Sequence, residues 1–166
     1  MGVYSGTVPT FLAGELADAD KFLEVTNFMT ATTAAWTSWA VAWTASAGTP
    51  AIGNGTLTSH YRRLGKTIDF RINLTAGTTT TFGTAGAAFR FDIPAGLTSV
   101  LTHTGSGLFL DASAGNQRYP LMWHIDASAN LFRLWRTNND TELLNNAPVT
   151  MTTSDALQFS GSLEIA

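Results

Sequence analysis

The feature that most constrains the fold is a strict alternation of apolar and polar side chains over residues 68–75. Apolar side chains take every second position: Ile68, Phe70, Ile72 and Leu74 alternate with Asp69, Arg71, Asn73 and Thr75. A period of two places the two sets on opposite faces of a β-strand. One face is therefore apolar, and it needs a second layer to cover it.

The residues just before this strand form its partner. Leu57, Ser59 and Tyr61 share one side of an extended chain, and the polar residues between them share the other. Gly65 lies between the two stretches and can take the positive φ that a short hairpin loop requires. The sequence therefore predicts a β-hairpin over residues 53–75, covered by the rest of the chain.

The composition indicates one β domain with a short appendage. The chain has 166 residues, of which 45% are hydrophobic and 13% charged, with a net charge of −3. A charged share of roughly 25% is usual, and the net charge gives no reason to expect a nucleic-acid partner, which would normally require a basic patch. Because cysteine is absent, disulfides and cysteine-based metal sites are excluded. We expect no signal peptide, no membrane association, and synthesis in a cytoplasm.

Residues 1–14 are predicted to be an extended lead. Val8 precedes Pro9, which favours extended backbone, while Phe11 and Leu12 are apolar without local cover. Two interpretations remain open at this point: a frayed terminus, or an arm that docks on a partner surface.

Residues 16–31 are predicted to be a short helix. Asp18 suits its N-cap, and Phe22, Val25 and Met29 follow at spacings of three and four, which makes an apolar seam. Such a helix is too short to be stable alone in water. It packs either on its own β domain or on copies of itself.

Three tryptophans, Trp36, Trp39 and Trp43, follow within eight residues. They are either buried packing at the junction of helix and domain, or a platform that stacks on sugars. For the second interpretation, Trp36 and Trp39 are the candidate glycan contacts.

Later segments predict further short strands. They lie at 87–93, 98–103, 107–112, 118–126, 130–136 and 156–165, and in the last one the register holds only if Gly161 faces the core. Many short strands separated by turn signals predict a mainly β fold, an antiparallel β-sandwich of jelly-roll type. It is preceded by an extended N-terminal arm and one short α-helix. We place the attachment arm and oligomerisation helix at 1–35 and the β-sandwich domain at 36–166.

No pattern favours catalysis. His60, His103 and His124 lack the spacing of metal ligands. Asp126 shares a strand face with His124, and Asp111 could join them in a metal or acid–base cluster, although surface polar positions explain them equally well. Ser106, between two glycines, lacks the strand-to-helix context of a nucleophile elbow. We expect no catalytic residue, metal or cofactor.

The hairpin carries a local basic cluster of Arg62, Arg63, Lys66 and Arg71. Such clusters are solvated, or they pair with carboxylates across strands. Asp69 and Asp92 are the candidate partners.

A set of short motifs is spread over nearly the whole chain. They comprise residues 8–15 (VPTFLAGE) with the helix at 17–29, 36–39 (WTSW), 43–46 (WTAS), 52–57 (IGNGTL), 61–67 (YRRLGKT), 74–77 (LTAG), 147–148 (AP), 154–155 (SD) and the final strand. As a set they resemble small structural proteins of tailed bacteriophages, especially those that infect actinobacteria. Residues 97–140 contribute little to this resemblance.

The resemblance implies a minor tail, fibre or capsid decoration protein in the virion, with an N-terminal attachment segment and a C-terminal β-sandwich, and commonly a homotrimer. On this basis we expect Val8, Pro9, Phe11 and Leu12 to attach to other virion proteins of the capsid or tail. We expect Phe22, Val25 and Met29 to meet their copies near the trimer axis. The resemblance carries no catalytic residue over.

The appendage is short and has no heptad shaft, which favours a capsid decoration or head-fibre role. The alternative is a minor tail or fibre protein whose carbohydrate-binding domain recognises a receptor, such as a glycan of the host cell wall. The two are not exclusive, since a fibre domain can also bind glycans. A cell-wall hydrolase is the remaining class.

Overall fold

The structure is a computed structural model, and it describes residues 19–32, 35–137 and 141–166. These residues form one helix, α1 (Ala19–Thr32), followed by strands. The strands are β1 (Thr37–Ser38), β2 (Trp43–Ala45), β3 (Pro50–Ala51), β4 (Thr56–Leu64), β5 (Thr67–Thr75), β6 (Thr81–Phe82), β7 (Phe89–Asp92), β8 (His103–Asp111), β9 (Gln117–Ile125), β10 (Leu131–Arg136) and β11 (Ala156–Glu164). The predicted mainly β fold is confirmed.

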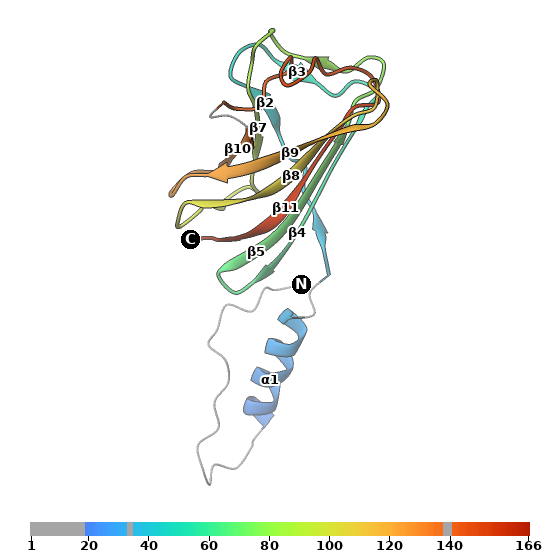
Figure 1. The fold of residues 1–166 in the computed structure, drawn as a ribbon. Coiled ribbons are helices and arrows are strands. Elements are labelled where there is room, and N and C mark those ends of the chain that lie inside the picture. Colours follow the sequence, from blue (N-terminus) through green and yellow to red (C-terminus); the bar gives the residue numbers. More distant parts are fainter. Residues whose placement is uncertain (1–18, 33–34, 138–140) are drawn as a thin grey trace.

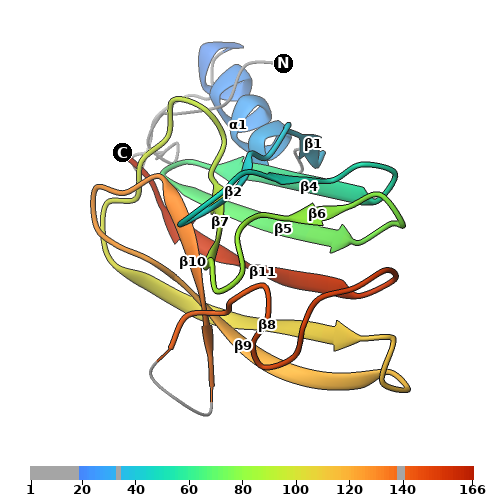
Figure 2. The same cartoon turned by 90° about the horizontal axis from the view of Figure 1, so that it is seen from above.

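Most strands belong to one curled antiparallel sheet. Its order is β1-β4-β5-β11-β8-β9-β10-β7-β2, and β3 pairs with β6 separately. Figure 2 shows β4, β5, β11, β8 and β9 in succession, with β10, β7 and β2 turning back across them. Aromatic rings fill the curl: Phe132 of β10 lies 4.4 Å from Phe70 of β5, and Phe91 of β7 lies 5.3 Å from Phe159 of β11, between ring centroids. The sandwich or jelly-roll form is not confirmed.

The hairpin of β4 and β5 has the predicted turn, and its apolar residues share a face as predicted. Leu57 pairs with Leu74, and Tyr61 with Phe70, while Gly65 in the turn has a φ of 60°. The four apolar side chains that alternate along β5 are at most 1% exposed: Ile68, Phe70, Ile72 and Leu74. Their burial follows from the alternation, because every second side chain points into the curl.

The two edges of the curled sheet are joined by a short piece of chain. β1 and β2 are the edge strands, yet residues 39–42 alone connect them. At about 3.5 Å per residue, this connection spans no more than ~18 Å. Trp39 N donates to the Ser59 carbonyl of β4, and Ala42 N donates to the Asp92 carboxylate of β7 at 2.6 Å. We call residues 39–42 the closing segment, because they form hydrogen bonds to β4 near one edge of the sheet and to β7 near the other.

The sheet also divides internally. β8 and β11 pair only as far as Gly107 opposite Phe159; beyond that point β8 continues beside β9 and β11 beside β5. The indole of Trp123 fills the division from the core side, and its Nε1 donates to the Ser160 carbonyl at 2.9 Å. A Cβ at Gly105 or Gly161 would lie within 2.5 Å of this ring. The prediction that Gly161 faces the core is confirmed.

Two predicted strands differ from the structure. Residues 98–103 and 107–112 were expected as separate strands, but one strand, β8, runs from His103 to Asp111. Residues 98–102 instead bond to the last residues of the chain. Val100 N donates to the Glu164 carbonyl, and Ala166 N donates to the Thr98 carbonyl. Gly105 and Gly107 suggest a break in the sequence, but here they are strand residues that leave room for Trp123 and Phe159.

Candidate functional site

Helix α1 lies beyond the end of the β4–β5 hairpin (Figure 1). Three of its described apolar side chains are exposed, Phe22 at 62%, Leu23 at 57% and Met29 at 61%, while Val25 is half-buried. Phe22, Val25 and Met29 follow one another at helical spacing and so share a face. Contact of this face with copies of the chain stays a prediction.

The structure does not describe the expected attachment residues. Val8, Pro9, Phe11 and Leu12 lie outside the described residues, and so does Asp18, the expected N-cap. Their roles stay predictions.

The two candidate glycan contacts lie on opposite faces of the sheet. In β1, Thr37 pairs with Tyr61 and Ser38 with His60, so Trp36 and Trp39, three residues apart, point in opposite directions. Trp39 packs edge-on against Tyr61, with ring centroids 5.7 Å apart.

Trp36 lies instead beneath the guanidinium of Arg71, 4.5 Å from the ring centroid, with Arg62 at 5.4 Å. The pair cannot form one stacking platform, and glycan contact by either residue alone stays a prediction. Trp43 is core, stacked on Phe91.

We call the face turned away from the core the outer face, and its side chains lie in rows across β4, β5 and β11. In one row Arg62 stands opposite Asp69, which stands opposite Ser162. Arg62 Nε donates to Asp69 at 2.8 Å, and the Ser162 hydroxyl donates to the same carboxylate. The bond from Ser162, together with the Arg62 guanidinium, lowers the pKa of Asp69 below its ordinary 3.8 although partial burial opposes this. This row is internally satisfied, as predicted for Arg62 and Asp69. Asp92, the other candidate partner, accepts from Ala42 N instead.

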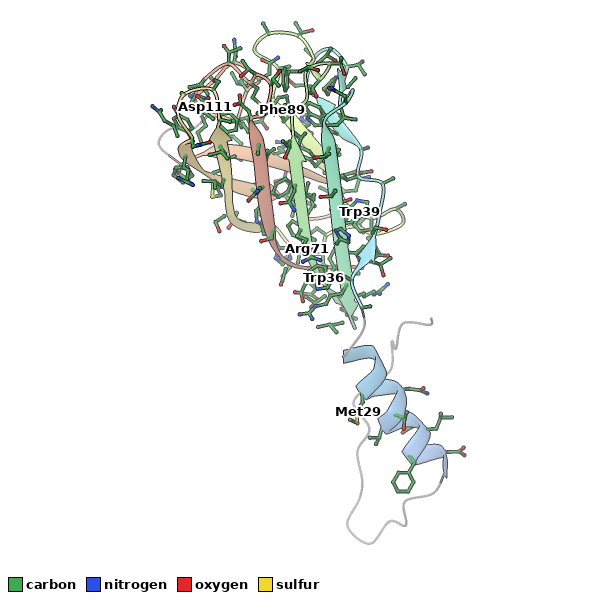
Figure 3. All side chains as sticks on the ribbon, turned by 90° about the vertical axis from the view of Figure 1, so that its right-hand side faces the viewer. Met29, Trp36, Trp39, Arg71, Phe89 and Asp111 are labelled. Atoms are coloured by element: carbon green, nitrogen blue, oxygen red, sulfur yellow. The ribbon has the colours of Figure 1, made fainter. Side chains whose placement is uncertain are left out.

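The adjoining rows form a groove. It opens where β8 and β11 part, has a volume of about 460 Å³, and is shallow. Its polar lining comes from three strands: Arg71 and Asn73 of β5, Gln158 and Ser160 of β11, and Ser106 of β8. We call it the outer groove. Figure 3 shows that Arg71 and Trp36 lie together near the end of the sheet closest to α1.

The polar groups of the outer groove are unpaired within the part of the chain that the structure describes. None of the five side chains forms a side-chain hydrogen bond there, and no carboxylate lies within 4.0 Å of the Arg71 guanidinium. Arg71 is also the single charged residue of the lining. The sequence pattern did not reveal this groove, because it depends on three strands that are far apart in the chain. The signal in retrospect is glycine at Gly105, Gly107 and Gly161, in otherwise regular strands.

Of the three residues considered as a possible metal or acid–base cluster, only His124 and Asp126 lie close together. His124 Nε2 lies 3.7 Å from the Asp126 carboxylate, but Asp111 does not join them. His124 pairs with Thr104 and Asp111 with Gln117, which separates His124 and Asp111 by about 23 Å along the strands. Figure 3 shows Asp111 at the end of the sheet far from α1.

The buried carboxylates of Asp111 and Asp155 accept hydrogen bonds from backbone N–H groups. Asp111 accepts from Ala114 N at 3.0 Å, and Asp155 accepts from Ala112 N and Thr152 N.

Within residues 19–32, 35–137 and 141–166, no group of three His, Asp or Glu side chains is arranged to hold a metal ion. In the same residues, no helix has the length and apolar character needed to cross a bilayer.

Comparisons with known proteins give no relative: no protein-family model, curated protein or solved structure matches this chain.

Proposed function

We propose that this protein is a structural component of a bacteriophage virion, a homotrimeric surface appendage that docks by its N-terminal segment and displays the β domain. The resemblance of its motifs to small phage structural proteins supports the virion role. The short appendage favours attachment to the capsid, as a decoration protein or head fibre, over attachment to the tail.

The observation that carries the assembly part of the proposal is the exposure of α1. Phe22 and Leu23 expose more than half of their surface, and a 14-residue helix is marginal in water without packing. Burying a large apolar side chain contributes about 1.5–3 kcal/mol. Two further copies of α1 are the occupants that suit this face, since each copy supplies the same apolar seam on a helix of the same length.

Light scattering on the purified full chain tests assembly. We expect a trimer mass for the natural protein and a monomer for the double variant Phe22→Ser with Val25→Ser. Glu24→Ser, on the other side of the helix, is the matched control and retains the trimer. All three should share one melting temperature for the β domain, because α1 lies outside its core. A natural protein that is monomeric throughout the micromolar range contradicts the proposal.

Gold-labelled antibody against the β domain, imaged on intact particles, tests the virion role. Label on the capsid supports a decoration or head-fibre protein. Label confined to the tail supports the alternative, a minor tail or fibre protein. Particles without label contradict both.

A further inference from the structure

We propose that the outer groove is a binding site for an anionic saccharide, that is, a sugar ring carrying a carboxylate or a phosphate. Arg71 pairs with the anion, while Asn73, Gln158 and Ser160 bind the ring hydroxyls. The site lies on the β domain, and it does not depend on assembly through α1.

The charge of the groove selects an anion. Arg71 is its single charged lining residue, and within the described ranges no carboxylate neutralises it. The contrast with Arg62 is direct: in the adjoining row that guanidinium is paired with Asp69 at 2.8 Å. A guanidinium offers a planar fork of donors that matches a carboxylate or phosphate.

Arg71 is also held in place. Its guanidinium lies 4.5 Å from the centroid of the Trp36 ring, a cation–π contact that restricts the long side chain before any ligand arrives. Trp36 therefore acts here as a positioning residue beneath Arg71. This differs from direct stacking on sugar, which was one of the two interpretations that the sequence left open.

The neutral part of the lining suits hydroxyl groups. Asn73 stands opposite Gln158, and a side-chain amide offers both donors and an acceptor, as a sugar hydroxyl requires. Ser106 and Ser160 add hydroxyls from the two strands that part. Leu108 provides an apolar wall.

The size and charge of the groove suit a small anionic ligand. The volume of about 460 Å³ falls in the range of about 300–1,000 Å³ for small-ligand sites. A nucleic acid needs a basic stripe, whereas this groove has one cation on a chain with a net charge of −3. A shallow site that remains in contact with water binds weakly, so we expect millimolar affinity for one ring.

Nuclear magnetic resonance titration of the ¹⁵N-labelled full chain tests the proposal. The probes are methyl glucuronide, glucose 6-phosphate, methyl glucoside, acetate and inorganic phosphate. We expect saturable shifts at the amides of residues 106–108 and 158–160 with an anionic sugar, and binding at least about tenfold weaker for methyl glucoside, acetate and inorganic phosphate. Which of the two anionic sugars binds more tightly identifies the anion as carboxylate or phosphate.

Variants assign the residues. Arg71→Gln should weaken binding of the anionic sugar by about tenfold or more and remove its advantage over methyl glucoside. Arg118→Gln, the same charge change at an exposed position outside the groove, is the matched control and should bind as the natural protein does. Trp36→Leu should weaken binding of the anionic sugar but not of methyl glucoside.

Three results overturn the proposal: no saturable shift with either anionic sugar, equal affinity for acetate or inorganic phosphate, or full affinity in Arg71→Gln with its fold intact. A monomeric protein that still binds the sugar separates this result from failure of the trimer proposal. Labelling of particles is likewise independent of it.

Discussion

At the scale of single residues, the row of Arg62, Asp69 and Ser162 makes stability depend on pH. Two donors stabilise the charged form of Asp69, so the pKa of its carboxyl is lower in the folded chain than the ordinary 3.8. A lowered folded pKa stabilises the fold above the unfolded value, and this stabilisation is lost as the pH falls through the folded value.

Replacing Asp69 tests this dependence. Asp69→Asn should be less stable than the natural protein at pH 7 by about 0.5–1 kcal/mol, as for a partly exposed ion pair. The difference should narrow as the pH is lowered below 3.8. Urea unfolding at a series of pH values measures it. Asp126→Asn, at a carboxylate that is 51% exposed, is the comparison. A difference that stays constant down to pH 2 would show that charge is not its cause.

At the scale of elements, the hairpin was predictable and the curl was not. Ile68, Phe70, Ile72 and Leu74 reveal their strand because burial on one face imposes a period of two. The partners of β11 could not be read in this way: β5 and β8 precede it by many residues, and strand order depends on contacts that no local pattern encodes. The division between β8 and β11 was hidden for the same reason, and glycines within β8 appeared to be a break between two strands.

The same division predicts the effect of enlarging Gly161. In Gly161→Ala the new Cβ would lie 2.3 Å from Cζ2 of Trp123, so the indole must shift and lose its bond to Ser160. We expect a loss of about 1–3 kcal/mol, as in other overpacked cores. Chemical unfolding followed by tryptophan fluorescence measures it.

Two controls separate the clash from a general effect. Ser106→Ala, on the outer face of the neighbouring strand, should be near neutral. Adding Trp123→Phe to Gly161→Ala should recover part of the loss, because the smaller ring leaves room, and a double-mutant cycle quantifies the coupling. Strictly additive losses would show that the ring is not the obstacle.

At the scale of the whole molecule, the candidate sites lie in three places: the first residues, α1 and the outer groove. The sequence predicted the first two, because uncovered apolar residues are visible in a linear pattern. For Trp36 the sequence left two interpretations open, buried packing and sugar stacking, whereas the structure places its ring beneath Arg71. The linear pattern did not separate Trp36 from Trp39, because it does not show that an edge strand of two residues directs them to opposite faces.

Deleting residues 1–14 tests the expected attachment. Phe11 and Leu12 are the expected anchors, and three arms in one trimer would strengthen attachment through effective concentration. The truncated protein should keep the melting temperature of the β domain but fail to join particles when supplied in place of the full chain. Immunoblotting of purified particles measures incorporation. Truncated protein found on particles at the normal level would place the docking surface elsewhere on the chain.

The closing segment has a mechanical consequence. A pull on α1 reaches the β domain at Trp36 and β1, which pairs with β4 through two residues only. The long ladders of β4 with β5 and of β5 with β11 lie further along the path of the force. Tension therefore detaches β1 and the closing segment first, and residues 36–42 can then span up to about 25 Å in all while the aromatic core stays intact. The β1 edge of the sheet thus separates under load before the rest of the domain, and β1 can pair with β4 again when the load is removed.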